Sequence, residues 1–555
     1  MARAKKNTSN KIIKKRIKTF FIIFLLLFTY LTYKIVNLTI FKNEEYESKI
    51  DRQSLETINL NSGRGIIYDK NNLPFTDQQK KKVLLVPKDI ISGNYQNVSL
   101  IKKSTKIKEE DIYKAVQEQL SKEIIEIDIN YIDESKIDEL EEKNIYVKEK
   151  TIRYSKNNLL THLIGYIKKS ENNGVSGIEK YMNNELKDSN KSYVSVFKPG
   201  ENNKGLNYLK GSIEETSENE ISKHLKLSID YKIQEKVEKI MNQEENPSAV
   251  IISDVKTGAI LSMCSRPNFN QDKISDYSNS VGGELQNRVL DATYPPGSVF
   301  KLVVLYAALE NNCIDKNYQY NCTGSTKVGS NNEVLNCNNN IAHGSQDISE
   351  SLANSCNCAF YDIAKRIGSE KIFEAIKKLH LDKKVDIGID EEKKSKLPDD
   401  IAISNLAIGQ ANIEFTPLQI NQLTQIIANN GTYMPLYIYD SIIDNNKKTI
   451  KKYKSNKISE IISPYTMTKI KNMMVKVSKD GTAKSLANLK GGCGVKTGTA
   501  QSSLNGKEIS HGWITGFYPE INPRYAITVI IEGTEKESKS ATPVFNDICK
   551  NLKLN

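Results

Sequence analysis

The sequence predicts a multidomain α+β protein with a single N-terminal transmembrane helix, an elongated α+β domain, and a second domain in which helices cover a five-stranded antiparallel sheet. Three observations lead to this prediction. The chain has 555 residues, too many for one compact domain. One long apolar run lies near the N-terminus, and β-rich segments flank a helical middle in the second half. We therefore expect four regions, at residues 1–18, 19–41, 42–222 and 223–555.

The first region is a basic tail. Residues 1–18 hold eight Lys or Arg and no acid, whereas the net charge of the whole chain is +12. The rest of the chain is thus only mildly basic, and nothing in it calls for a nucleic-acid partner. Because positively charged flanks of membrane segments stay inside the cell, the tail is expected to be cytoplasmic and the body extracellular.

Residues 19–41, "TFFIIFLLLFTYLTYKIVNLTIF", form the predicted membrane anchor. The run reaches the ~20 residues that a helix needs to cross a bilayer. A cleaved signal peptide is the alternative, but no small-x-small cleavage site follows the run, which stays apolar and bulky. We therefore predict a retained single-pass anchor in the cell membrane.

The third region, residues 42–222, is rich in Lys, Glu, Ile and Asn. Residues 99–124 show the pattern of a helix after a polar start. The region has no evident cluster of reactive side chains. We interpret it as an elongated α+β platform.

The fourth region changes character. Residues 248–265, "SAVIISDVKTGAILSMCS", are two β-rich runs around a Lys-Thr-Gly turn, which predicts a hairpin. Helical patterns dominate from about 284 to 430, and three strand candidates follow in "GCGVKTGTA", "SHGWITGFYP" and "RYAITVIIEG". Two strands, a helical middle and three strands can close as one antiparallel sheet, and "SATPVFNDICKNLKLN" predicts a closing helix.

Three short motifs in this region suggest chemistry: "YPPGSVFKL", "NSCNCAF" and "VKTGTA". Each alone occurs often by chance, and residues 255–259, "VKTGA", repeat the Lys-Thr-Gly pattern in the hairpin turn. Their order and their spacing of about 57 and 139 residues are specific. Together they predict a serine acyl-transfer site. Its candidate residues are Ser298, Lys301, Ser355, Asn357, Lys496, Thr497, Gly498 and Thr499.

The residue types fit that chemistry. Pro-Pro-Gly starts a helix near Ser298, where backbone N–H groups favour developing negative charge. Lys301 lies one turn further on the same face, and in a dry pocket its amine can accept the serine proton. Ser355 can relay that proton, and Asn357 offers an amide to a peptide carbonyl. The alternative, a capping Ser298 beside a solvated Lys301, is disfavoured by three motifs in order.

The third motif is expected to bind substrate. Lys496 should precede a strand whose hydroxyl groups, on Thr497 and Thr499, can bind a carboxylate. The backbone N–H groups of Ser298 and Thr499 are candidates for an oxyanion hole.

These motifs resemble those of class B penicillin-binding proteins, which are peptidoglycan D,D-transpeptidases. The resemblance covers nearly the whole chain. It extends to "SGRGIIYDKNNLPF" (62–75) and "GVSGIEKYMNNEL" (174–186) in the platform, and to "LSIDYKIQ" (227–234), "LAIGQANIEFTPLQ", "DGTAKSLA" and "HGWITGFYP" in the last region. It implies that the last region is a transpeptidase domain of the penicillin-binding and β-lactamase type, behind a dimerisation or pedestal domain.

The resemblance also implies the reaction. Ser298 would attack the D-Ala-D-Ala carbonyl of a donor stem peptide, and an amine of a neighbouring stem would resolve the acyl-enzyme. β-Lactams would acylate the same serine, catalysis would need no cofactor, and a SEDS-type glycosyltransferase would be the membrane partner. A membrane-anchored β-lactam receptor or a β-lactamase is the alternative function.

A cysteine cluster predicts a separate structural metal site. Four of the eight cysteines and one of five histidines fall within 37 residues, with the spacing C-x14-C-x5-H-x14-C. Thiolates and imidazole suit tetrahedral zinc, and the metal would hold a polar loop against the helix after Ser355. A Cys322–Cys337 disulfide and a plain buried core are the alternatives. The predicted Zn²⁺ ligands are Cys322, Cys337, His343 and Cys358, with Cys356 or Asp347 as the substitute.

Overall fold

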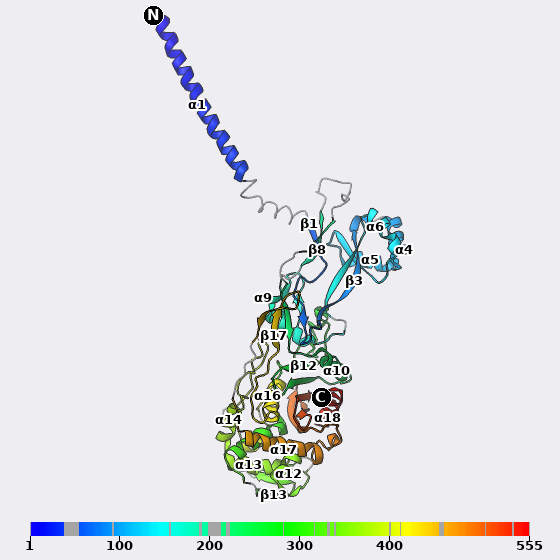
Figure 1. Ribbon diagram of the computed structural model, residues 1–555, viewed down its shortest axis with the longest axis vertical. Coiled ribbons are helices and arrows are strands. Elements are labelled where there is room, and N and C mark those ends of the chain that lie inside the picture. Colours follow the sequence, from blue (N-terminus) through cyan, green and yellow to red (C-terminus); the bar gives the residue numbers. More distant parts are fainter. Residues whose placement is uncertain are drawn as a thin grey trace. The chain divides into compact units, whose positions relative to one another are not determined.

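The structure is a computed structural model of the full chain (Figure 1). It forms two compact units, each of which contains segments that are distant in sequence. Described below are residues 2–37, 55–91, 94–154, 157–187, 191–197, 213–217, 222–280, 282–315, 317–329, 333–337, 340–398, 401–410, 412–453, 460–504, 507–534 and 538–553.

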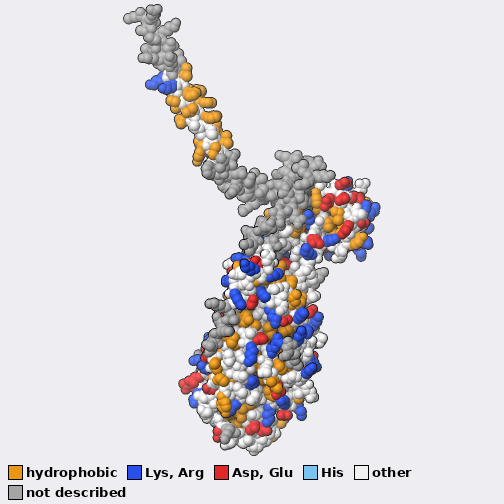
Figure 2. All heavy atoms as spheres, viewed as in Figure 1, with side chains coloured by type: hydrophobic (Ala, Val, Ile, Leu, Met, Phe, Trp, Pro, Cys, Tyr) orange, Lys and Arg blue, Asp and Glu red, His pale blue; other side chains and the backbone are white. Residues whose placement is uncertain are grey.

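Helix α1 (Ala2–Val36) contains the predicted anchor. Its segment Lys15–Val36 has a mean hydropathy of 2.0 and is long and apolar enough to cross a membrane. Figure 2 shows apolar side chains around this part of the helix, and they are exposed. The helix begins earlier than expected, because the basic tail continues it without a break, and residues 38–41 of the predicted anchor lie outside the described part.

The first unit contains α1, residues 81–150 and two strands from the end of the platform. Its main sheet has the order β4-β3-β5, and helices pack on one face through buried side chains such as Leu84, Ile101 and Ile112. A second sheet has the order β1-β8-β9. The elements are β1 (Leu55–Asn59), β3 (Thr76–Pro87), α3 (Lys88–Ile91), α4 (Tyr95–Thr105), α5 (Glu109–Glu118), β4 (Ile124–Ile129), α6 (Ile137–Glu142), β5 (Tyr146–Tyr154), β8 (Ser192–Phe197) and β9 (Ile213–Ser217).

The second unit joins the last region to residues 61–80 and 151–191. The two compact units therefore do not divide the chain at the single boundary expected between residues 222 and 223, because part of the platform belongs to the second unit. Part of the platform packs with the last region through sheet β18-β17-β10-β2, in which β2 pairs in parallel with β10. The elements are β2 (Ile67–Tyr68), α7 (Thr161–Ile164), β6 (Ile167–Lys168), β7 (Asn173–Gly174), α8 (Gly177–Tyr181), α9 (Asn183–Leu186), β10 (His224–Leu227), β17 (Tyr439–Ile443) and β18 (Thr449–Lys452).

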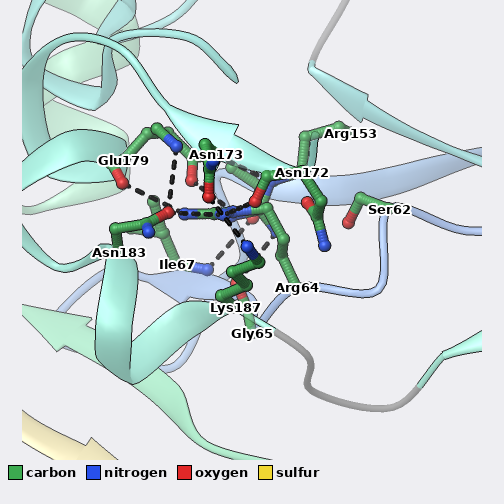
Figure 3. Close-up of polar contacts among 12 residues, drawn as sticks. Ser62, Arg64, Gly65, Ile67, Arg153, Asn172, Asn173, Glu179, Asn183 and Lys187 are labelled. Atoms are coloured by element: carbon green, nitrogen blue, oxygen red, sulfur yellow. Dashed lines mark hydrogen bonds and ion pairs between the residues drawn. The ribbon is translucent and has the colours of Figure 1, made fainter. Parts of the chain in front are cut away.

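A buried ion cluster holds this platform part together (Figure 3). Arg64 Nε lies 2.8 Å from Glu179 Oε2, and Arg153 Nε lies 2.9 Å from Glu179 Oε1. Arg153 also pairs with Asp77. The Arg64 and Glu179 side chains are fully buried, so each charge depends on the other for compensation. One carboxylate thereby connects three segments that are far apart in the chain.

The predicted five-stranded antiparallel sheet is confirmed, with the order β12-β11-β21-β20-β19. The hairpin at 248–265 forms β11 and β12, and both strands are buried along almost their whole length because helices cover both faces. Helix α16, every residue of which is buried, packs on β11 and β21. The strands are β11 (Ser248–Asp254), β12 (Ile260–Arg266), β19 (Gly494–Leu504), β20 (Lys507–Tyr518) and β21 (Tyr525–Ile531).

The other helices of this domain fall in two groups in Figure 1: α10 and α18 lie beside the sheet, and α12, α13, α14 and α17 lie together at the far end of the domain. The helices of the domain are α10 (Tyr231–Met241), α11 (Lys301–Glu310), α12 (Ile348–Ala353), α13 (Asn357–Ile367), α14 (Ser369–Lys378), α15 (Ile403–Ile408), α16 (Pro417–Ala428) and α17 (Pro464–Asp480), with α18 (Ser538–Asn551) as the predicted closing helix. Short strands β13 (Gln319–Cys322), β14 (Ser325–Val328), β15 (Glu333–Asn336) and β16 (Gly344–Asp347) form two small ladders before α12.

The buried cluster yields a stability prediction. We expect Glu179→Gln to lower the free energy of unfolding by about 3–5 kcal/mol, because two buried guanidinium groups lose their shared anion. Glu118→Gln is the control, since the Lys114–Glu118 pair is exposed and such pairs contribute little. Denaturant unfolding of the purified chain measures both. An equal, small change in the two variants would contradict the prediction.

Candidate active site

The site begins at a tight turn before α11. Gly297–Phe300 forms one turn of 3₁₀ helix, η4, which leads directly into α11 and carries Ser298. Gly297 has φ +50°, and a Cβ atom there would lie 2.2 Å from the Thr499 carbonyl oxygen. Only glycine therefore allows the Ser298 turn to approach strand β19 so closely.

Lys301 lies at the start of α11 with its amine inside the site. The side chain is fully buried, and Nζ lies 3.1 Å from Ser298 Oγ. Nζ also donates to Asn357 Oδ1 and to the Ser355 carbonyl oxygen, each at 2.7 Å. Burial lowers the pKa of Lys301 to about 8, because the charged form loses its hydration. The amine can thus become neutral next to the serine hydroxyl.

Ser355 lies between two lysines in a strained turn. Its φ is +52°, which is unfavourable for a residue with a side chain. Ser355 Oγ is 3.2 Å from Lys301 Nζ and 3.0 Å from Lys496 Nζ. The hydroxyl can therefore pass a proton from one amine to the other.

Lys496 lies within β19, not before a strand as the sequence suggested, because β19 begins at Gly494. Its Nζ donates to the Thr497 carbonyl oxygen at 2.6 Å. Burial first, and then the charge of Lys301, hold the pKa of Lys496 well below its usual range. Thr499 pairs with Gly512 on β20 in this same strand.

Gly498, in the third motif, is the point at which β19 packs against the segment that carries Ser298. A Cβ atom at Gly498 would lie 3.0 Å from both the Pro296 carbonyl oxygen and Val299. Strand β19 can therefore pack this closely against the Ser298 turn only where a side chain is absent.

Thr482 is a site residue that the motif search missed. Its hydroxyl lies 2.6 Å from the Thr497 hydroxyl, and its N–H donates to the Ala353 carbonyl oxygen at 3.0 Å. It thus joins β19 to the turn that holds Ser355. Thr482 is part of "DGTAKSLA", a segment that resembles the family but for which the sequence predicted no side-chain role.

Further contacts anchor the segment before Ser298. The Trp513 indole donates to the Pro295 carbonyl oxygen at 3.0 Å. The Tyr294 hydroxyl donates to Glu532, and the Tyr294 backbone pairs with Phe415. Single aromatic residues of this kind have no recognisable spacing, so only the fold reveals their role.

Asn357 connects the site to strand β15. While Oδ1 accepts from Lys301, Nδ2 donates to the Asn336 carbonyl oxygen at 2.8 Å. Asn336 ends β15 and directly precedes Cys337. The end of β15 therefore borders the site next to Asn357.

The cysteine cluster has a different composition from the one predicted. The ligand atoms of Cys322, Cys337, His343 and Cys356 all lie within 4.8 Å of one another. Cys358 Sγ lies 3.5 Å from Cys337 Sγ but is outside this group, because α13 turns its side chain toward the Leu335 carbonyl. Cys356, the substitute named from sequence, therefore takes its place. Asp347 instead caps α12.

Comparisons with known proteins agree with this geometry. Residues 248–550 match the penicillin-binding protein transpeptidase domain, and residues 59–206 match the penicillin-binding protein dimerisation domain. Stage V sporulation protein D of Bacillus subtilis is 30% identical, over 84% of this chain and 74% of that protein. Peptidoglycan D,D-transpeptidase MrdA of Acinetobacter baumannii is 23% identical, over 92% and 84%.

A solved structure shares the fold. It is the complex between penicillin-binding protein PBP2 and MreC from Helicobacter pylori, with a TM-score of 0.62 and 25% identity over 90% of this chain and 98% of that chain.

If Ser298 is the acylated residue and Lys301 its base, the lowered pKa of Lys301 predicts the pH dependence of acylation. Only the neutral amine accepts a proton, so the second-order rate with a fluorescent penicillin should rise about tenfold per pH unit below about 8 and level off above it. Stopped-flow or gel measurement between pH 6 and 9.5 tests this. A rate that is independent of pH across that range would contradict Lys301 as the base.

Proposed function

Because the chain belongs to the class B penicillin-binding proteins, which are peptidoglycan D,D-transpeptidases, we propose that Ser298 is its nucleophile and Lys301 its general base. The enzyme cross-links peptidoglycan by serine-type acyl transfer, and this class acts without a cofactor. The observation that supports the residue assignment best is the buried amine of Lys301, 3.1 Å from Ser298 Oγ.

The proposed reaction has two acyl transfers. Neutral Lys301 takes the Ser298 proton as Oγ bonds to the carbonyl carbon of the penultimate D-Ala. The C–N bond then breaks, and terminal D-Ala leaves after its nitrogen receives a proton through Ser355. In the second half, the amine of another stem peptide attacks the ester carbonyl and loses its proton to the same relay, which returns a proton to Ser298 Oγ as the bond between Oγ and the acyl carbon breaks. β-Lactams acylate Ser298 in the first step only.

The remaining motif residues would bind the donor. The N–H groups of Ser298 and Thr499 stabilise the oxyanion. Asn357 holds a peptide carbonyl, and Thr497 and Thr499 bind the terminal carboxylate near Lys496, with Gly498 keeping the strand close. Support comes from the convergence of these groups around Ser355, whose hydroxyl touches both lysine amines.

The membrane arrangement is also proposed. We place residues 1–18 in the cytoplasm, the anchor of residues 19–41 in the membrane and the catalytic body outside, on the strength of the basic tail and the apolar segment Lys15–Val36. A SEDS-type glycosyltransferase is the proposed membrane partner, supported by the class of the chain. MreC is the partner named for the Helicobacter pylori protein.

We further propose that the cysteine cluster holds a structural Zn²⁺ through Cys322, Cys337, His343 and Cys356. Two thiolates on one tetrahedral zinc lie ~3.8 Å apart, given Zn–S bonds of about 2.3 Å. The Cys322–Cys337 and Cys337–Cys356 sulfur distances are both 3.6 Å, close to that value and far beyond a disulfide bond. Four protein ligands leave the zinc no substrate position, so it would act on stability alone.

The nucleophile prediction uses penicillin labelling. Ser298→Ala and Lys301→Ala should each abolish the covalent adduct while the unfolding transition is retained, and Ser275→Ala, an exposed serine, should label normally. Mass spectrometry locates the adduct. An adduct on another serine would overturn the assignment. Rapid release of the drug would favour a β-lactamase, whereas a stable adduct without cross-linking of stem peptides would favour a receptor.

The metal prediction is tested by elemental analysis of protein purified without added metal. We expect about one zinc per chain, lost together with thermal stability in Cys356→Ser and retained in Cys358→Ser. A metal-free wild-type protein would end the zinc proposal without affecting the transpeptidase assignment.

A further inference from the structure

A hairpin beside the active site has no role in the reaction derived above. Strands β14 and β15 pair antiparallel, and we call them the cysteine-bracketed hairpin because Cys322 precedes β14 and Cys337 follows β15. The two sulfur atoms lie 3.6 Å apart at its base. At the same end, the Asn336 carbonyl accepts a hydrogen bond from the catalytic Asn357. The hairpin is therefore continuous with the catalytic wall.

The two faces of the hairpin differ. Thr326 pairs with Leu335, and this inner face packs on the domain core through Leu335 and the buried Val328. Lys327 pairs with Val334 on the outer face, and both side chains are exposed. Val334 is 61% exposed, which is unusual for an apolar strand residue beside an active site.

The edge of β15 points toward the same wall. The Cys337 N–H donates to the Gly324 carbonyl at 2.9 Å, so the backbone N–H and C=O groups of Cys337 face the chain that leads into β14. Backbone groups alternate along a strand, and Asn336 and Val334 therefore direct theirs to the outer edge. The contact of the Asn336 carbonyl with Asn357 shows that this outer edge borders the site.

We propose that the outer face and outer edge of the cysteine-bracketed hairpin, at Lys327 and Val334, form a subsite for the donor stem peptide on the N-terminal side of its D-Ala-D-Ala end. This inference rests on the proposed function. An extended peptide held by Asn357 at its reacting end continues along the adjoining edge of β15, where strand backbone can pair with it. Stem peptides carry carboxylates upstream of the scissile bond, and Lys327 supplies the complementary charge.

The subsite would bind the long donor and leave small acylating drugs unaffected. Penicillin has no upstream peptide, so it reports on Ser298 and Lys301 alone. A stem-length donor reports on both the reacting groups and the hairpin. The difference between these two readouts separates a binding role of the hairpin from a structural one.

The test uses the full chain and three synthetic ester donors: one with an acidic stem peptide, one with its upstream carboxylates amidated, and one truncated to the acylated terminal dipeptide. Lys327→Glu should raise KM for the acidic donor about threefold to tenfold with kcat nearly unchanged. The amidated and truncated donors, and the rate of penicillin acylation, should stay within about twofold of wild type. Val334→Ser should raise KM for both stem-length donors but not for the truncated one.

Lys365→Glu, which reverses an exposed charge on α13, is the matched control and should leave all three donors unchanged. An equal loss with every donor and with penicillin would show a structural role and overturn the subsite. Unchanged kinetics with the acidic donor would overturn it as well. If wild-type enzyme consumed none of the donors while Ser298 still bound penicillin, the proposed function itself would fail, and the subsite with it.

Discussion

The burial of the Lys301 amine is the constraint on which the rest of the site depends. An ammonium group without water and without a carboxylate partner is costly, and here its contacts are uncharged oxygens of Ser298, Ser355 and Asn357. Those contacts require the end of α12, the start of α13 and the η4 turn to meet at one atom. The same desolvation lowers the pKa of Lys301 to about 8, so that a neutral amine is available near neutral pH. The packing that fixes the geometry therefore also sets the protonation state.

A second buried lysine makes the arrangement a coupled system. Lys496 reaches the other side of Ser355 from β19, where burial and the charge of Lys301 lower its pKa. One hydroxyl, on Ser355, bridges the two amines, and its backbone is held in a strained conformation. Thr482 completes this arrangement by joining the Ser355 turn to β19 through its N–H and its hydroxyl.

The sequence predicted the features that depend on spacing and periodicity. The β11–β12 hairpin, the five-stranded sheet and the closing helix follow from local patterns, and the three motifs were recognisable from their order. The anchors at Tyr294 and Trp513 depend on which strands become neighbours, which no local pattern encodes. Cys356 and Cys358 are both buried beside Cys337, and only the positions of the sulfur atoms in the fold decide which of them joins Cys322 and His343. The sequence also did not indicate that residues 61–80 and 151–191 pack with the last region. That packing depends on which distant segments become neighbours in the fold.

The contact between Gly297 and the Thr499 carbonyl has a consequence for drug resistance. At this point the η4 turn and strand β19 lie as close together as two backbones allow. A substitution at Gly297 would push the Ser298 turn away from strand β19. Under the proposed assignment of Ser298 as nucleophile, resistance to β-lactams therefore has little room to arise by substitution at Gly297.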